Sequence, residues 1–223
     1  MEPLLTIRRA LGRIRRAFVY DFFEVFARDV RAEDTEFKNP PGYRFLLATV
    51  PHIAACDELH TELNERERNE GIARIKMGHD CVIAFPTTVI NSNTNTNPPA
   101  VFTMWINWNN LNIPGHIKRR LLPNQAFIYK AFTSPAHRGR KLYESGMRFT
   151  LAELHRRNKT ELLGYAHVKK TVSRKGLAAV EFRTIGSFRT IGFGSFMITF
   201  SSRALRSALP NALRSSTRAA AQN

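Results

Sequence analysis

The sequence predicts an α/β fold in which a mixed β-sheet carries helices on its faces. Three observations support this: aromatic and β-branched strand patterns come first, a strand–helix–strand unit follows at about residues 124–168, and further strand patterns come after it. The short connections in that unit make its two strands parallel, because a crossover of this kind returns in the same direction. An apolar share of 43% over 223 residues is enough for one large core.

The chain begins with a basic amphipathic pattern, predicted as a helix over residues 1–18. Leu4, Ile7, Leu11, Ile14 and Phe18 recur at helical spacing, and arginines cover most of the remaining surface. Such a helix can dock on an anionic membrane surface, or it can pack on the domain with a solvated arginine face. Both interpretations stay open at this point.

Residues 19–202 are predicted to form the folded domain. An uncharged loop at 91–99 joins two strands as an antiparallel hairpin, and residues 31–41 form another loop. Strands are predicted over 18–27, 43–50, 80–90, 101–108, 124–133 and 161–168, and helices over 52–74, 139–157 and 173–182.

Two features are predicted near the C-terminus. The pentapeptide Phe-Arg-Thr-Ile-Gly occurs twice at a period of six from residue 182, which indicates either two edge strands in a hairpin or an accidental duplication. Residues 203–223 contain no acid and many Ala, Ser and Arg, and we expect a basic, disordered tail there.

The net charge of +16 predicts an anionic partner: nucleic acid, an anionic membrane or a phosphate-rich small molecule. Nucleic acid is the weaker interpretation, because the arginines gather at the termini and near residue 138, without a recognisable binding motif. Cys56 and Cys81 lack metal-ligand spacing, so we expect no metal and two reduced, buried thiols. Without a spanning apolar run or a signal peptide, the expected location is cytoplasmic, including the inner face of a membrane.

The stretch "AFTSPAHRGRKLYESG" places basic residues where a predicted strand passes into a predicted helix. Arg138, Arg140 and Lys141 surround Gly139. A helix start has unpaired N–H groups and partial positive charge, and a glycine lets an anion approach the backbone. The turn therefore predicts a phosphate or pyrophosphate site at the carboxyl end of the strand, the alternative being a solvated cationic helix start.

The segment "FTSPAHRGRKLYESGMRFTLAEL" resembles the signature of the GNAT acyltransferase superfamily, in which Arg-Gly-x-Gly-x-Gly/Ala opens a long helix. The segment "ELLGYAHVKKTVSRKGLAAVEFRTIG" is similar to the second half of that pattern. The resemblance covers about residues 43–200 by element order and 124–192 by sequence. It implies a splayed sheet and loop amides that hold the pyrophosphate of acetyl-CoA or another acyl-CoA.

The chain departs from the family pattern at four positions. Lys141 and Tyr143 replace small residues of the loop, Lys170 replaces an asparagine, and Glu181 replaces a glycine. A catalytically degenerate member of the fold, or a protein that binds polyanions by charge alone, is therefore the alternative to an active enzyme.

The resemblance implies direct attack of an amine or hydroxyl acceptor on the acyl thioester, and it assigns the site. On its strand, His167 is the predicted general base and Tyr165 the proton donor, because alternate residues share a face. Tyr143 and His137 are further proton-handling candidates. The predicted coenzyme A contacts are Phe132, Thr133, Arg138, Gly139, Arg140, Lys141 and Ser173; Glu58 and Glu62 are candidates beside the acceptor.

Trp105 and Trp108 lie three residues apart and so point to opposite faces of a strand. Core packing is the default for such residues, and an aromatic wall for a flat acceptor is the alternative for one of them.

Overall fold

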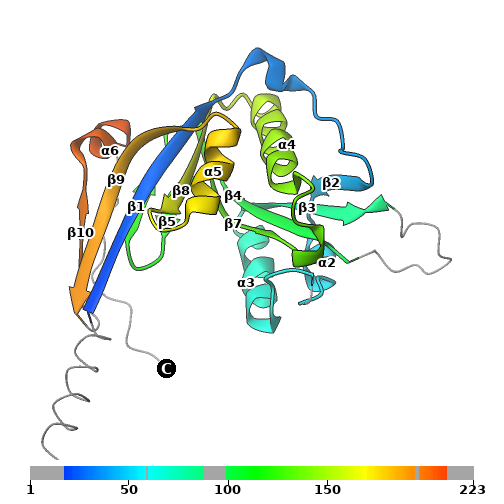
Figure 1. Ribbon diagram of the computed structural model, residues 1–223, viewed down its shortest axis with the longest axis horizontal. Helices are drawn as coiled ribbons and strands as arrows, with labels where there is room; N and C mark the ends of the chain where they lie inside the picture. Colours follow the sequence, from blue (N-terminus) through cyan, green and yellow to red (C-terminus); the bar gives the residue numbers. More distant parts are fainter. Residues whose placement is uncertain (1–17, 59, 88–98, 194–195, 210–223) are drawn as a thin grey trace, which may run out of the picture.

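The computed structural model describes residues 18–58, 60–87, 99–193 and 196–209. The predicted N-terminal helix apart from Phe18, most of the predicted hairpin loop at 91–99, and residues 210–223 of the predicted tail lie outside the described residues. The core of the fold is one strongly twisted sheet with helices on both of its faces (Figure 1).

The main sheet has eight strands in the order β10–β9–β1–β8–β7–β4–β3–β2, and a separate two-stranded hairpin pairs β5 with β6. The pair β7–β8 is parallel and the other neighbouring pairs are antiparallel, which confirms the predicted mixed sheet. The strands are β1 (Phe18–Asp29), β2 (Tyr43–Leu47), β3 (Asp80–Pro86), β4 (Phe102–Asn107), β5 (Asn110–Ile113), β6 (Ile117–Arg120), β7 (Gln125–Thr133), β8 (Glu161–His167), β9 (Arg183–Phe193) and β10 (Phe196–Ser201).

Helices cover both faces of the sheet. On one face α4 and α5 enclose a core that includes Phe102, Met147 and Leu177. On the other face α2 and α3 pack over β3 and β4, and the β5–β6 hairpin and α6 pack over β1, β8 and β9. The helices are η1 (Ala32–Thr35), α2 (Val50–Ala54), α3 (Glu65–Lys76), η3 (Pro135–His137), α4 (Leu142–Arg156), α5 (Thr171–Ala179) and α6 (Arg203–Ala208). Within the described ranges, none of the helices combines the length and apolar character needed to span a bilayer.

The N-terminal strand β1 lies inside the sheet, between β8 and β9. Its residues Phe23–Asp29 pair with β8, and Phe18–Ala27 pair with β9. Because both faces of the sheet are covered there, consecutive residues such as Val25, Phe26 and Ala27 are all buried. The strand patterns that come latest in the sequence therefore depend on the first one for their pairing.

The predicted helix over 52–74 is wrong in its extent, because the structure has two helices, α2 and α3, separated by turns. The side chain of Asn64 accepts a hydrogen bond from the Glu67 amide at 2.9 Å and so caps the start of α3. Cys56 and Cys81 are buried free thiols, as interpreted from the sequence.

Three further differences concern hairpins and the tail. The repeat is one continuous strand, β9, rather than a hairpin of its own, and its even period places both copies on the same face. Its hairpin partner is β10, and the β5–β6 hairpin was not predicted. The predicted tail begins too early, because α6 buries Leu205 and Leu209 completely.

Gly146 brings α4 close to the sheet, and we expect its replacement by alanine to destabilise the protein. A Cβ at this position would lie 2.5 Å from two ring atoms of Phe102, a fully buried side chain of β4. Such overpacking costs about 1–3 kcal/mol of unfolding free energy. Urea unfolding of Gly146→Ala measures this loss. Gly42→Ala is the comparison, since a Cβ there meets no atom within 4 Å and only backbone strain opposes it; an equal loss in both variants would contradict the packing argument.

Candidate functional site

The parallel strands β7 and β8 separate partway along their length. Gln125–Phe127 pair with Glu161–Leu163, and no further pairs join the two strands, although β7 continues to Thr133 and β8 to His167. Their outer edges stay paired, β7 with β4 and β8 with β1. Two facing edges with unpaired backbone groups can hold an extended polar chain between them, in the manner of an added strand. The splayed sheet implied by the family resemblance is therefore present.

A β-bulge bends β7 where the strands separate. The register against β4 shifts between Thr103 and Trp105, so that Lys130 and Ala131 together face one residue of β4. Lys130 has a φ of 48°, in the left-handed region that costs a non-glycine residue about 1–2 kcal/mol. A bulge twists and redirects a strand, and strained backbone of this kind gathers at functional sites.

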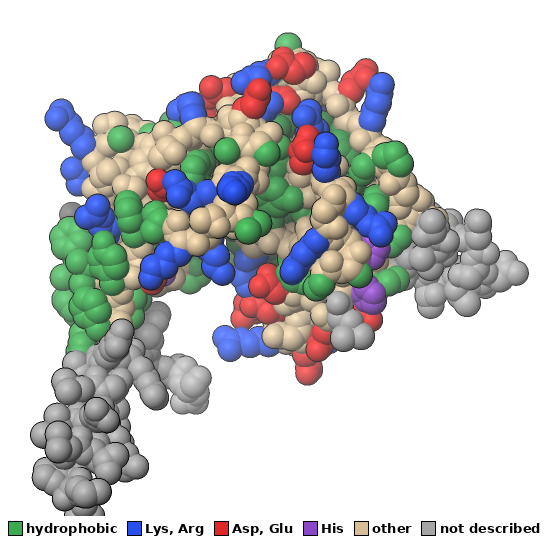
Figure 2. Space-filling model, viewed as in Figure 1, with side chains coloured by type: hydrophobic (Ala, Val, Ile, Leu, Met, Phe, Trp, Pro, Cys, Tyr) green, Lys and Arg blue, Asp and Glu red, His purple; other side chains and the backbone are tan. Residues whose placement is uncertain are grey.

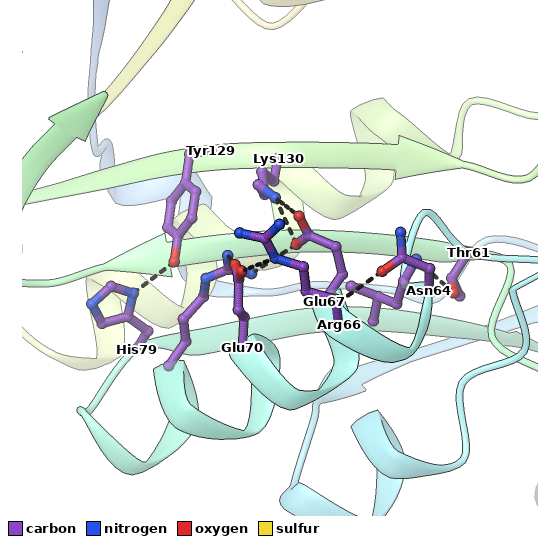
Figure 3. A network of polar contacts seen from close by, with 10 residues as sticks. Thr61, Asn64, Arg66, Glu67, Glu70, His79, Tyr129 and Lys130 are labelled. Carbon is purple, nitrogen blue, oxygen red and sulfur yellow. Dashed lines mark hydrogen bonds and ion pairs between the residues drawn. The ribbon is translucent and has the colours of Figure 1, made fainter. Parts of the chain in front are cut away.

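The bulge is held in place by α3, as Figure 3 shows. Lys130 Nζ donates hydrogen bonds to both carboxylate oxygens of Glu67, at 2.8 and 2.7 Å. Arg74 lies 3.4 Å from the same carboxylate. The hydrogen bond from Lys130 lowers the pKa of Glu67, so the carboxylate is charged at neutral pH. The ion pair thereby connects the strained turn of β7 to a helix on the α3 side of the sheet.

A tyrosine–histidine pair lies on the same face, and the sequence analysis did not find it. The Tyr129 hydroxyl lies 2.6 Å from His79 Nδ1, and the Tyr129 ring stacks on Phe127 with ring centres 5.9 Å apart. Burial raises the pKa of Tyr129 and lowers the pKa of His79. At neutral pH the imidazole is therefore uncharged and able to accept a proton.

His167 and Tyr165 share a face of β8, as the alternation predicts, and both rings contact Phe23. His167 Nδ1 accepts the Lys169 amide at 3.1 Å, and Nε2 lies 3.4 Å from a carboxylate oxygen of Asp21. Both ring nitrogens are thus engaged in this arrangement.

Tyr165 stacks on Phe127, with ring centres 5.7 Å apart, and burial raises the pKa of its hydroxyl. Phe127 therefore contacts both Tyr165 of β8 and Tyr129 of β7. The catalytic roles of His167 and Tyr165 stay predictions.

The basic loop lies at the open end of the strands. After β7 ends at Thr133, the turn η3 leads to Gly139, and α4 begins at Leu142, three residues later than predicted. Gly139 has a φ of 74°, and a Cβ there would meet no atom within 4 Å. Within the described ranges, the amides of residues 139–141 donate to no protein group. The loop therefore presents free amide donors in an exposed left-handed turn.

The cations of the loop are also available. The side chains of Arg140 and Lys141 are exposed, and neither forms an ion pair with any described residue. Arg138 Nε donates to the Thr133 carbonyl at 3.2 Å, which joins two of the predicted contact residues. Free amides beside unpaired cations suit an anionic oxygen cluster.

The residues that depart from the family pattern leave the loop open. Lys141 takes a left-handed φ of 56° and its side chain is exposed. The Tyr143 ring packs against α5, where a Cβ on Gly176 would lie 2.9 Å from it, and burial raises the pKa of Tyr143. Phe132 is partly buried near the end of β7. Ser173 is exposed in the first turn of α5, without a contact to the loop in the described part of the chain.

The remaining candidates lie apart from the loop or are engaged elsewhere. Trp105 is buried core, as predicted by default, whereas the Trp108 ring is covered by the Arg157 guanidinium at 4.2 Å. The His137 ring accepts or donates at 2.9 Å to Tyr43, and burial lowers its pKa. Glu58 pairs with Arg68 at 3.3 Å, and Glu62 is exposed.

Two hollows of about 430 and 320 Å³ lie elsewhere. The larger is lined by Asn124 and Thr160 at the opposite ends of β7 and β8, and the smaller by Arg28 and Arg148. Neither is lined by the basic loop, so we place the anion site on the loop amides rather than in a hollow.

No family model matches the sequence, and no curated protein matches it. Three solved structures have a similar fold. A GCN5-related N-acetyltransferase from Sphaerobacter thermophilus aligns over 88% of this chain with 10% identity and a TM-score of 0.50. The tandem GNAT protein from the clavulanic acid biosynthesis pathway aligns over 90% with 13% identity and a TM-score of 0.50. The glucosamine N-acetyltransferase region of a fungal multi-domain β-N-acetylglucosaminidase aligns over 90% with 12% identity and a TM-score of 0.52.

This chain covers 56%, 59% and 23% of the lengths of those proteins, respectively. Identities this low speak for architecture rather than for substrate. The mixed sheet, the parallel strands that separate and the helix that follows the basic loop agree with that architecture. The chain therefore has the fold of the GNAT acetyltransferases.

Proposed function

We propose that this protein is an acyltransferase that moves an acyl group, acetyl in the simplest case, from a coenzyme A thioester to an amine or hydroxyl acceptor. The observation that carries the proposal is the separation of β7 and β8 at the end where the basic loop precedes α4. One feature offers unpaired strand edges to an extended arm, and the other offers free amides and cations to a diphosphate.

The residues present fit such a co-substrate. The amides of residues 139–141, with Arg140 and Lys141, would hold the pyrophosphate. The pantetheine arm would pair with the free edge of β7 near Phe132 and Thr133, although the Thr133 carbonyl already accepts a hydrogen bond from Arg138. Ser173 stays a predicted contact, without support from the described contacts.

The chemistry requires a base near neutral pKa and a donor for the departing sulfur. A C–N or C–O bond forms as the C–S bond breaks, the acceptor loses a proton, and the thiolate takes one up. His79 with Tyr129 is the pair whose protonation state suits the first task, since the imidazole is uncharged at neutral pH. Tyr165 and Tyr143, both protonated at neutral pH, are the proposed donors for the second.

Coenzyme A is expected to raise the unfolding temperature by about 5 °C or more at a hundredfold excess over its Kd. Desulfo-coenzyme A should do the same, because the proposed contacts are to the pyrophosphate and the arm rather than to sulfur. The measurement is thermal unfolding at moderate and high salt, with heparin as the polyanion comparison.

The alternatives give different results in the same measurement. A protein that binds polyanions by charge alone should respond to heparin at least as strongly as to coenzyme A, and high salt should remove both responses. A degenerate member of the fold should bind coenzyme A specifically and release no free thiol from acetyl-CoA with any of a panel of amines.

A further inference from the structure

The outer strands carry an apolar face made of three cross-strand rows. In the order β1, β9, β10 the rows are Phe18–Phe193–Phe196, Tyr20–Ile191–Ile198 and Phe22–Arg189–Phe200. Residues directly opposite each other in antiparallel strands share a face, and so do alternate residues of one strand. These nine residues are called the aromatic face below.

The aromatic face is open in the described part of the chain. Seven of its residues are between 39% and 64% exposed, and Figure 2 shows hydrophobic side chains gathered over this end of β1, β9 and β10. Helices α4 and α5 cover the same side of the sheet only further along, and α6 and the β5–β6 hairpin pack on the opposite side. Soluble proteins rarely expose a contiguous apolar area of this kind without a partner.

The charges around the face indicate what kind of partner it fits. The nine positions contain one cation, Arg189, whose guanidinium lies 4.7 Å from the centre of the Phe22 ring, and no acid. Phe18 directly follows a segment with five arginines and one acid in residues 1–17. A second copy of the chain would bring another net charge of +16 against this end, whereas an anionic surface would be attracted to it.

We infer that the aromatic face docks on an anionic lipid bilayer, with its phenylalanines at the boundary between headgroups and acyl chains and the neighbouring arginines on lipid headgroups. The interfacial region suits aromatic rings and long cations, which place their apolar parts inward and their polar parts toward water. The inference is independent of the proposed transferase activity, because the face and the basic loop share no residue.

The test is co-sedimentation of the full chain with phosphatidylcholine vesicles that do or do not contain phosphatidylserine. The wild type should bind only the phosphatidylserine vesicles, and less so at high salt. The double variant Phe193→Ser/Phe196→Ser should bind about tenfold more weakly or worse, because two half-exposed rings no longer enter the interface. The matched control is Met77→Ser/Val172→Ser, which removes two exposed apolar side chains elsewhere and should bind like the wild type.

Several outcomes would overturn the inference. It fails if the wild type binds no vesicles, or if the Phe193→Ser/Phe196→Ser variant with unchanged circular dichroism binds as well as the wild type. The inference also fails if light scattering finds a wild-type dimer that the double variant converts to a monomer, since the occupant would then be a second copy. Single substitution Phe200→Ser, with an expected smaller loss, separates a local folding defect at Phe193 from loss of the face.

Discussion

Replacement of Gly139 by valine is expected to lower the affinity for coenzyme A by about a hundredfold or more. The loop amides can point outward together because Gly139 takes a φ of 74°, which a β-branched residue disfavours. A shift of this turn would remove at least two amide contacts to the diphosphate, each worth about 1.5–3 kcal/mol when the acceptor is charged. Isothermal titration with coenzyme A and with desulfo-coenzyme A measures the loss.

Gly78→Val is the matched control for backbone strain. Gly78 has a φ of 83° at the end of α3, and a Cβ there also meets no atom within 4 Å. Both variants should lose similar stability, but only Gly139→Val should lose affinity. Equal affinities in the two variants would remove the basic loop from the proposed site, whatever the fold.

The strands and their pairing partners differ in how far the sequence predicts them. Local patterns suffice for β7, α4 and β8, because apolar spacing and short connections decide a strand–helix–strand unit. The position of β1 between β8 and β9 is set by pairing between residues far apart in the chain, and no local pattern records it. The β5–β6 hairpin escaped prediction because its strands have only four residues each, too short for a clear alternation.

The basic loop was predicted from its composition, because clustered cations beside a glycine are visible in the sequence. The Tyr129–His79 pair was not, since Tyr129 lies within an apolar strand and its partner is 50 residues away. The same holds for the Lys130–Glu67 ion pair, which depends on a bulge that only the register against β4 reveals. Chemistry carried by neighbours in the sequence is predictable here, and chemistry carried by neighbours across the sheet is not.

A buried ion pair at the end of β1 shows the same limit. Arg28 and Asp34 are joined by two hydrogen bonds, at 2.6 and 3.1 Å, and each side chain is 8% exposed. Asp34 also accepts the Arg31 amide at 2.8 Å, in a segment that the sequence analysis predicted as a loop. The pair fixes η1, which packs against α4, to the strand between β8 and β9.

Substitution Asp34→Ala is therefore expected to cost about 3 kcal/mol of unfolding free energy, because it leaves the buried Arg28 guanidinium without its principal partner. Urea unfolding measures the loss, and the unfolding temperature should fall by about 6 °C or more. Glu33→Ala, one residue earlier, removes an exposed carboxylate paired to Arg31 at 3.5 Å and should cost less than about 1 kcal/mol. The double variant Arg28→Met/Asp34→Leu should regain most of the lost stability, since an apolar pair removes the stranded charge; if it stays as unstable as Asp34→Ala, packing rather than charge burial explains the loss.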